Sequence, residues 1–255
     1  MKFYYLVHFQ FLGFRYHGWQ KQTELKTVQQ TIEDCFSKYL GHSSFRTIGA
    51  SRTDSMVSAN HSLFEIISES EIEDELFLAN FNQFLPADIK VLKMEKVDKG
   101  FKIISAPKVK EYLYFFSFGI KNHPFSAPFM THINENLNLE LMKEAAKLFE
   151  GTHYLKSFCF KPKENQNFQR EIIHSEIEMN NILTANFFPD KSYLFRIKAK
   201  SFMRYQIRMM MGALFEVGMN KLTIDELKKS LSSDENLKVM IAPASGLILN
   251  YSLIE

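Results

Sequence analysis

The chain has few cysteines and no long hydrophobic run, and each shortage excludes a class of protein. Its 255 residues include only two cysteines, Cys35 and Cys159. Two cysteines so far apart in the sequence indicate reduced thiols, and they do not suggest a disulfide framework or a zinc site. No segment is apolar for long enough to span a bilayer. The N-terminal apolar stretch meets His8 and Gln10 too early for a signal peptide, so we expect a cytoplasmic protein.

Charge of one sign is also scarce, because the formal net charge is only +2. Nucleic-acid-binding domains are often far more basic, so composition alone does not indicate one. Any basic surface must come from local clustering of lysine and arginine. The 25 phenylalanines mostly indicate core, since stacking on bases is a minority use of such rings.

The hydrophobic pattern alternates between strand and helix periods, which predicts an α+β fold. Apolar residues at every second position predict a strand over 3–11, and Thr27–Gln30 fits a capping box that opens a helix ended by Gly41. The same criteria predict further strands at 61–67, 89–97, 111–118, 172–179, 192–200 and 246–251, and further helices at 70–84, 138–149, 203–217 and from Thr223.

The pattern loosens around residues 100–110, where we place a boundary between two sheet-based halves, 1–105 and 106–255. Both halves share a coarse strand–helix–strand order, which indicates a duplicated α+β unit with mainly antiparallel strands flanked by helices.

Three segments carry side chains suited to chemistry. The loop 49–55 places Arg52 close to Asp54, and a paired, ionised carboxylate can act as nucleophile or base. The tripeptide Arg52-Thr53-Asp54 is also of a kind that occurs in ordinary surface turns, where the two charged side chains form only a weak ion pair.

The second segment contains Arg204 and Arg208, which are four residues apart and would share one face of a helix. With Arg196, Lys198 and Lys200 they form either a basic stripe for phosphates or a solvated face.

The third segment is the strand that carries Tyr112 and Tyr114, which point to the same side beside Lys108 and Lys110. A tyrosine here could stack on a base or move a proton, or simply pack in the core.

Taken in order along the chain, these motifs resemble the tRNA pseudouridine synthase A family over essentially the whole sequence. The matching segments are 15–22, 27–29, 52–54 with Val57 and Ala59, 82–89, 202–212 and 242–247. The resemblance implies two α+β halves around a positively charged cleft. It also implies a homodimer that binds tRNA and isomerises uridine to pseudouridine in the anticodon stem-loop, at about positions 38 to 40, after flipping the base from its stack. Neither a metal nor another cofactor is implied.

The resemblance also assigns roles to residues. Asp54 matches the catalytic aspartate, Tyr112 the tyrosine that stacks on the base and handles the C5 proton, and Arg208 the arginine that pairs with the aspartate. Arg52 matches the arginine that displaces the target base. We expect RNA contacts from Arg52 and from four further basic residues, Arg15, Lys110, Arg204 and Lys198.

Several positions depart from the family pattern. Met56 and Ser58 stand where the family has glycine and histidine after the aspartate, and Glu111 stands where it favours arginine. Glycine permits backbone angles that methionine resists. A non-catalytic or retargeted RNA-binding paralogue of the same fold therefore stays open as the alternative function.

Overall fold

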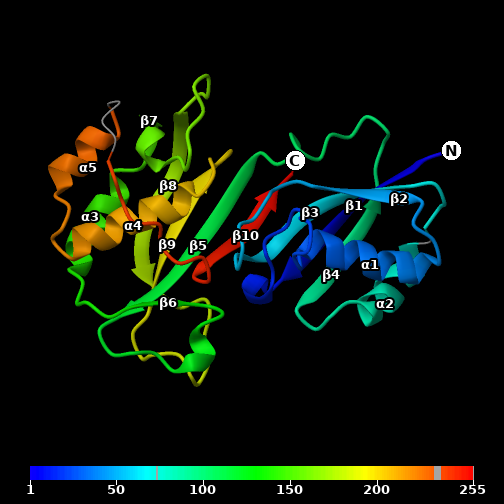
Figure 1. The fold of residues 1–255 in the computed structure, drawn as a ribbon, viewed down its shortest axis with the longest axis horizontal. Helices are drawn as coiled ribbons and strands as arrows, with labels where there is room; N and C mark the ends of the chain where they lie inside the picture. Colours follow the sequence, from blue (N-terminus) through cyan, green and yellow to red (C-terminus); the bar gives the residue numbers. More distant parts are fainter. Residues whose placement is uncertain (73, 233–236, 255) are drawn as a thin grey trace. The chain divides into compact units, whose positions relative to one another are not determined.

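The computed structural model describes residues 1–72, 74–232 and 237–254. The chain forms two compact units, Met1–Lys108 with Ile248–Glu255, and Val109–Leu247. Each unit contains a β-sheet with helices packed on it (Figure 1), and most strand pairs are antiparallel. The α+β fold class predicted from the sequence is confirmed.

The sheet of the first unit has the strand order β4-β1-β3-β10, and β2 also pairs with β3. The strands are β1 (Phe3–Phe11), β2 (Phe45–Gly49), β3 (Ser58–Ser68), β4 (Ile89–Lys96) and β10 (Leu247–Leu253). The β1, β2 and β4 pairings are antiparallel, whereas β10 runs parallel to β3. The strand predicted for 3–11 is confirmed, and Tyr5, Val7 and Phe9 of its apolar face are fully buried, but Leu6 between them is buried too, in a second apolar cluster.

Two helices lie side by side on this sheet, α1 (Val28–Leu40) and α2 (Asp74–Phe84). They meet through aromatic rings, with the Phe36 and Phe81 centroids 5.4 Å apart. Thr27 Oγ1 accepts from the Gln30 amide at 3.3 Å, as predicted, and Gly41 ends α1 at φ +74°. The expected capping box is only half formed, because the Gln30 side chain donates to Asp34 instead of returning to the cap.

The sheet of the second unit has the order β5-β9-β8-β7, and β6 also pairs with β5. The strands are β5 (Val109–Phe118), β6 (Thr131–Ile133), β7 (Gly151–Tyr154), β8 (Gln169–Met179) and β9 (Tyr193–Ala199). The predicted pairing of the strands at 172–179 and 192–200 is confirmed by the antiparallel β8–β9 ladder.

The helices of this unit are α3 (Leu139–Lys147), α4 (Gln206–Gly218) and α5 (Ile224–Ser230). Asn138 caps α3, and Thr223 with Glu226 forms the predicted capping box of α5. One-turn 3-10 helices occur at Gly13–Arg15, Pro124–Ser126 and Lys156–Phe158. The α3 and α4 helices cover one face of the sheet: Ser175 Oγ of β8 donates to Ala146 O at 2.7 Å, and the Phe116 and Phe215 rings are 5.4 Å apart.

The division into units differs from the sequence-based one at both boundaries. The first unit extends to Lys108 rather than 105, and Ile248–Glu255 belongs to it although we assigned the C-terminus to the second half. The physical reason is that β10 extends the first sheet, where Ile248 pairs with Ser58 and Leu249 with Ala59. Within the described ranges, no helix is both long and apolar enough to cross a membrane.

Candidate active site

The Asp54 turn, residues 50–57, joins β2 to β3. The Val57 amide donates to Asp54 O at 3.2 Å and closes the turn. Met56 adopts φ +66°, the left-handed conformation that favours glycine. The methionine therefore takes up the backbone geometry that the family motif reserves for glycine, at the cost of strain that the surrounding contacts must offset.

Those contacts come from the segment 13–19, which lies directly against the turn. Met56 N donates to Tyr16 O at 3.0 Å, and Trp19 N donates to Thr53 O at 3.3 Å. Gly13 N donates to Ser58 Oγ at 2.9 Å. Ser58 thus supports the turn from the position where the family has histidine. Hydrogen bonds at Thr53 and at Met56 therefore fix the backbone before and after Asp54.

Gly18 also packs closely against this turn. Its φ is +82°, and a Cβ there would stand 2.4 Å from Thr53 O and 3.1 Å from the Asp54 carbonyl carbon. Trp19, which is buried, fills the space beside Gly49 in the same way, since a Cβ on that glycine would lie 2.3 Å from the indole nitrogen. The sequence analysis placed Gly18 and Trp19 in the matching segment 15–22 but gave them no role. The structure shows that both pack against the Asp54 turn or the strand before it, so their presence in that motif could have pointed to a supporting role.

Arg52 and Asp54 do not pair as the turn pattern suggested. Arg52 is exposed, and among the described residues it forms no ion pair. Asp54 is partly buried and has other polar interactions. The hydroxyls that flank Arg52, Ser51 Oγ and Thr53 Oγ1, are buried and have no hydrogen-bond partner in the described part of the chain. An exposed guanidinium beside two unused hydroxyls is suited to contact a polar ligand.

Arg15 is anchored by Asp88, which also receives the Tyr16 hydroxyl at 2.8 Å. Burial raises the pKa of the Asp88 carboxyl, but hydrogen bonds from Arg15 and Tyr16 outweigh it, and the pKa lies below its usual value. Burial also raises the pKa of Tyr16 to about 12. Over half of the Arg15 side chain remains exposed despite this pairing.

In the second unit, β5 presents Tyr112 and Lys110. The Tyr112 side chain is buried and meets the Phe202 ring edge-to-face at 5.3 Å. Tyr114, on the same side of the strand, bonds to Pro243 O and Thr131 Oγ1 within the core. Burial lowers the pKa of the Lys110 amine.

The helix predicted over 203–217 begins only at Gln206, because its N-cap Tyr205 adopts φ +58°. We expected Arg204 and Arg208 to lie one turn apart on this helix, but Arg204 precedes the helix. Both guanidinium groups nevertheless converge on one ring: the Cζ atoms of Arg204 and Arg208 lie 5.2 and 4.8 Å from the Tyr205 centroid. Arg208 Nε also donates to Ala242 O at 2.7 Å.

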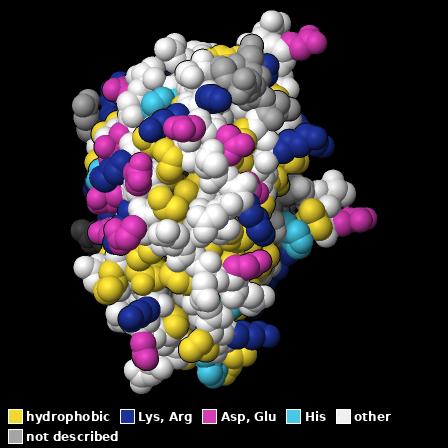
Figure 2. Space-filling view, turned by 90° about the vertical axis from the view of Figure 1, so that its left-hand side faces the viewer, with side chains coloured by type: hydrophobic (Ala, Val, Ile, Leu, Met, Phe, Trp, Pro, Cys, Tyr) yellow, Lys and Arg dark blue, Asp and Glu magenta, His cyan; other side chains and the backbone are white. Residues whose placement is uncertain are grey.

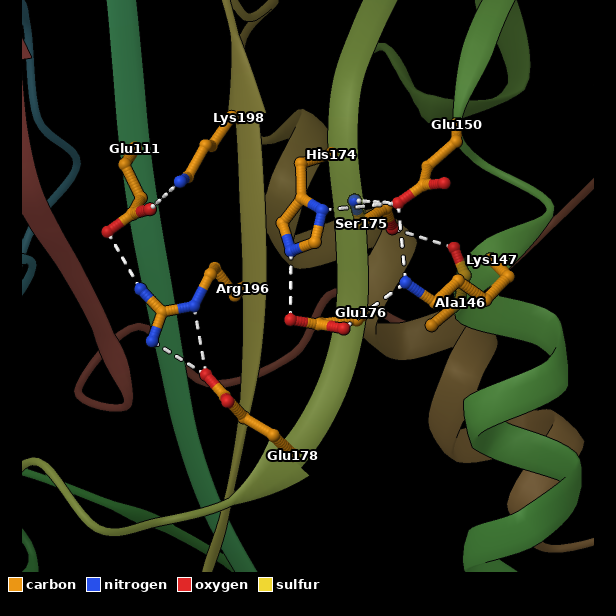
Figure 3. Close-up of polar contacts among 10 residues, drawn as sticks. All are labelled: Glu111, Ala146, Lys147, Glu150, His174, Ser175, Glu176, Glu178, Arg196 and Lys198. Carbon is orange, nitrogen blue, oxygen red and sulfur yellow. Dashed lines mark hydrogen bonds and ion pairs between the residues drawn. The ribbon is translucent and has the colours of Figure 1, made fainter.

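The expected basic stripe on β9 is partly neutralised within the sheet, as Figure 3 shows. The buried Glu111 carboxylate contacts Lys198 Nζ and an Arg196 guanidinium nitrogen, each at 2.9 Å, and Arg196 also pairs with Glu178. Next to this group, His174 bonds to Glu176 and pairs with Glu150. Glu111 therefore acts as the counter-charge of two basic residues, which explains how this strand accommodates a carboxylate where the family favours arginine.

Charges of both signs are also mixed on one face of the surface. On the face that Figure 2 shows, dark blue and magenta side chains alternate and hydrophobic side chains gather between them. Among the described residues, no group of three His, Cys, Asp or Glu side chains could hold a metal ion. The predicted site residues thus fall into two sets, with Asp54, Arg52 and Arg15 in the first unit and Tyr112, Lys110, Lys198, Arg204 and Arg208 in the second.

Comparisons with known proteins match most of the chain to one family. A family model described as tRNA pseudouridine synthase matches residues 145–252. The chain is 31% identical to tRNA pseudouridine synthase A of Thermodesulfovibrio yellowstonii, over 94% of this chain and 95% of the relative. It is 33% identical to the enzyme of that name from Acetivibrio thermocellus and 32% identical to that from Phytoplasma mali, each over 93% of both chains. The resemblance seen in the motifs is therefore confirmed, and the chain belongs to the tRNA pseudouridine synthase A family.

Proposed function

We propose that this tRNA pseudouridine synthase isomerises a uridine of the anticodon stem-loop, with Asp54 as its catalytic carboxylate. The observation that carries the proposal is the support of the Asp54 turn, which three backbone hydrogen bonds and the close approach of Gly18 hold in place. Catalytic groups must be held within a fraction of an ångström of their productive geometry, so a turn fixed in this way suits a reacting side chain.

The reaction class accounts for the other residue types. Breaking the C1′–N1 bond, turning the uracil and rejoining it through C5 requires the base to leave its stack, at a cost of a few kcal/mol. Arg52, exposed and without a carboxylate partner among the described residues, is suited to enter the vacated position. We assign Tyr112 to stacking on the base and handling of the C5 proton, and Arg208 to pairing with the catalytic carboxylate.

The remaining assignments concern binding and assembly. We propose that Arg15, Lys110, Arg204 and Lys198 contact the tRNA backbone, and that the protein works as a homodimer in the cytoplasm. The support is the family membership together with the exposed guanidinium groups of Arg15 and Arg204.

The alternative, a non-catalytic or retargeted RNA-binding paralogue, is motivated by Met56 in place of glycine. The left-handed φ of Met56 favours the catalytic interpretation, because the turn keeps a conformation that glycine would adopt readily. Under the alternative, the protein binds tRNA in a salt-sensitive manner but forms no pseudouridine.

The test is to treat tRNA lacking pseudouridine with wild-type protein, with Asp54→Ala, and with Asp98→Ala as the matched control. Asp98 is an exposed carboxylate of the same unit and has no role in the turn. Carbodiimide mapping should show a new pseudouridine in the anticodon stem-loop with the wild type and the control, and none with Asp54→Ala, while tRNA binding changes by less than about threefold. Equal modification by wild type and Asp54→Ala would refute the assignment of Asp54. Binding without modification by the wild type would favour the alternative.

A further inference from the structure

Two segments of the second unit meet in a row of alternating cations and rings, which we call the cation stack. It consists of Phe160, Lys161, Arg204, Tyr205 and Arg208. The Phe160 and Tyr205 rings lie 4.7 Å apart at an interplanar angle of 43°. Arg204 Cζ lies over both rings, 5.1 Å from the Phe160 centroid and 5.2 Å from that of Tyr205. Lys161 Nζ lies 5.5 Å from Phe160 at one end, and Arg208 Cζ lies 4.8 Å from Tyr205 at the other.

Two members of the cation stack, Arg204 and Lys161, differ in their pairing from other basic residues of this unit. Lys143, Lys147, Arg196 and Lys198 each pair with a carboxylate. Arg204 and Lys161 are exposed, and no carboxylate of the described residues forms an ion pair with either. Repulsion between Arg204 and Lys161, which share the Phe160 ring, is unfavourable unless the rings and an external anion offset it.

The backbone is held in an uncommon conformation to build this arrangement. Lys161 has φ +50° and Tyr205 has φ +58°, both in the left-handed region that non-glycine residues rarely occupy. The two segments are joined by a hydrogen bond from Phe160 N to Arg204 O at 3.1 Å. Strained residues persist where the surrounding structure fixes them, and they concentrate at ligand-binding positions.

We propose that Arg204 and Lys161 of the cation stack bind backbone phosphates of the tRNA, with Phe160 and Tyr205 as the residues that position Arg204. The inference rests on the proposed function. A guanidinium lying over a ring face keeps the N–H groups at its edge available, and these match the oxygens of a phosphate. Because both rings contact Arg204, they restrict its rotamers before the RNA arrives and reduce the entropy cost of binding.

The experiment measures the affinity of the full-length protein for unmodified tRNA between about 50 and 300 mM KCl. Each phosphate contact contributes about 0.7 to 0.9 to the slope of log affinity against log salt, equivalent to roughly fivefold in affinity near 0.15 M. Arg204→Gln and Lys161→Gln should each reduce the slope by about that amount. Phe160→Leu, which keeps an apolar side chain but removes the ring, should reduce it in the same direction, whereas Phe160→Tyr should restore wild-type behaviour. The matched control is Lys143→Gln, which removes an exposed lysine paired with Glu140.

Steady-state kinetics separates positioning from general damage to the fold. We expect Phe160→Leu to raise KM with kcat unchanged, since phosphate contacts bind ground state and transition state alike. A slope and KM for Arg204→Gln and Phe160→Leu equal to those of Lys143→Gln would overturn the inference. If the wild type binds and modifies tRNA and these variants behave like it, only the phosphate-binding role of the cation stack is refuted. A wild type that neither binds nor modifies tRNA refutes the proposed function as well.

Discussion

Replacing Gly18 by alanine tests whether the segment 13–19 holds the Asp54 turn. Two costs add at this position. Alanine at φ +82° pays about 1–2 kcal/mol for the left-handed backbone, less about 0.4–1 kcal/mol because the unfolded chain also loses freedom. Its Cβ would also stand 2.4 Å from Thr53 O, and this oxygen belongs to the backbone and not to a flexible side chain. Overpacking of this kind costs about 1–3 kcal/mol. We therefore expect a loss of about 2–4 kcal/mol in the free energy of unfolding.

Gly41 provides the matched control within the same unit. It has a similar φ of +74°, but a Cβ there would meet nothing within 4 Å. Gly41→Ala should therefore carry only the backbone cost, about 1 kcal/mol or less. The difference between the two variants isolates the contact with the Asp54 turn.

The assay combines urea titration with the rate of pseudouridine formation. If the turn yields to relieve the contact, Asp54 moves, and a displacement of about 1 Å costs on the order of 100-fold in rate. Gly41→Ala should keep the wild-type rate. Equal stability and equal activity of Gly18→Ala and Gly41→Ala would refute the reasoning that the packing of Gly18 against Thr53 positions the carboxylate.

Two further predictions concern charged groups outside the Asp54 turn. Glu111→Ala leaves Arg196 and Lys198 without their buried partner and should lower the free energy of unfolding in urea by about 2–4 kcal/mol. The control Glu140→Ala removes an exposed pair and should lower it by less than about 1 kcal/mol. Equal losses for the two variants would contradict the role of Glu111 as a buried counter-charge. For Asp88, hydrogen bonds outweigh burial and lower the folded-state pKa below the ordinary 3.8, so its contribution to stability is complete above that pH and disappears as the pH falls through the folded-state pKa. Asp88→Asn should therefore lower stability at pH 7 and flatten its decline below about pH 4, and an unchanged acid profile would argue against this linkage.

The long periodic elements could be predicted from the sequence because their burial follows their local pattern. The strands β1, β5, β8 and β9 and the caps at Asn138 and Thr223 are where the pattern placed them. The strands β2, β6 and β7, of five residues or fewer, were missed because a pattern needs more repeats than they provide. The start of α4 was misplaced because the left-handed Tyr205 interrupts an otherwise helical sequence.

For the candidate site, motifs identified residue types but not their surroundings. The approach of Gly18 to Thr53 joins positions 35 apart in the chain, and the contacts of Glu111 with Arg196 and Lys198 cross between strands. Such contacts depend on the register of β5 against β9, in which Glu111 faces Lys198. A charge count along the sequence treated Arg196 and Lys198 as available cations, and only the pairing of the strands shows that they share a buried carboxylate.

The position of β10 has a consequence for the order in which the protein is made. It pairs with Ser58 and Ala59, directly after the Asp54 turn, yet it is synthesised about 190 residues later. At about 5–20 residues per second, roughly 10–40 s pass between the two strands during translation. Throughout that interval the edge of β3 that β10 will occupy lacks its final partner, while the whole second unit is made in between. The first unit is begun before the second unit and completed after it, so its carboxylate turn gains this neighbouring strand only once the second unit has been made.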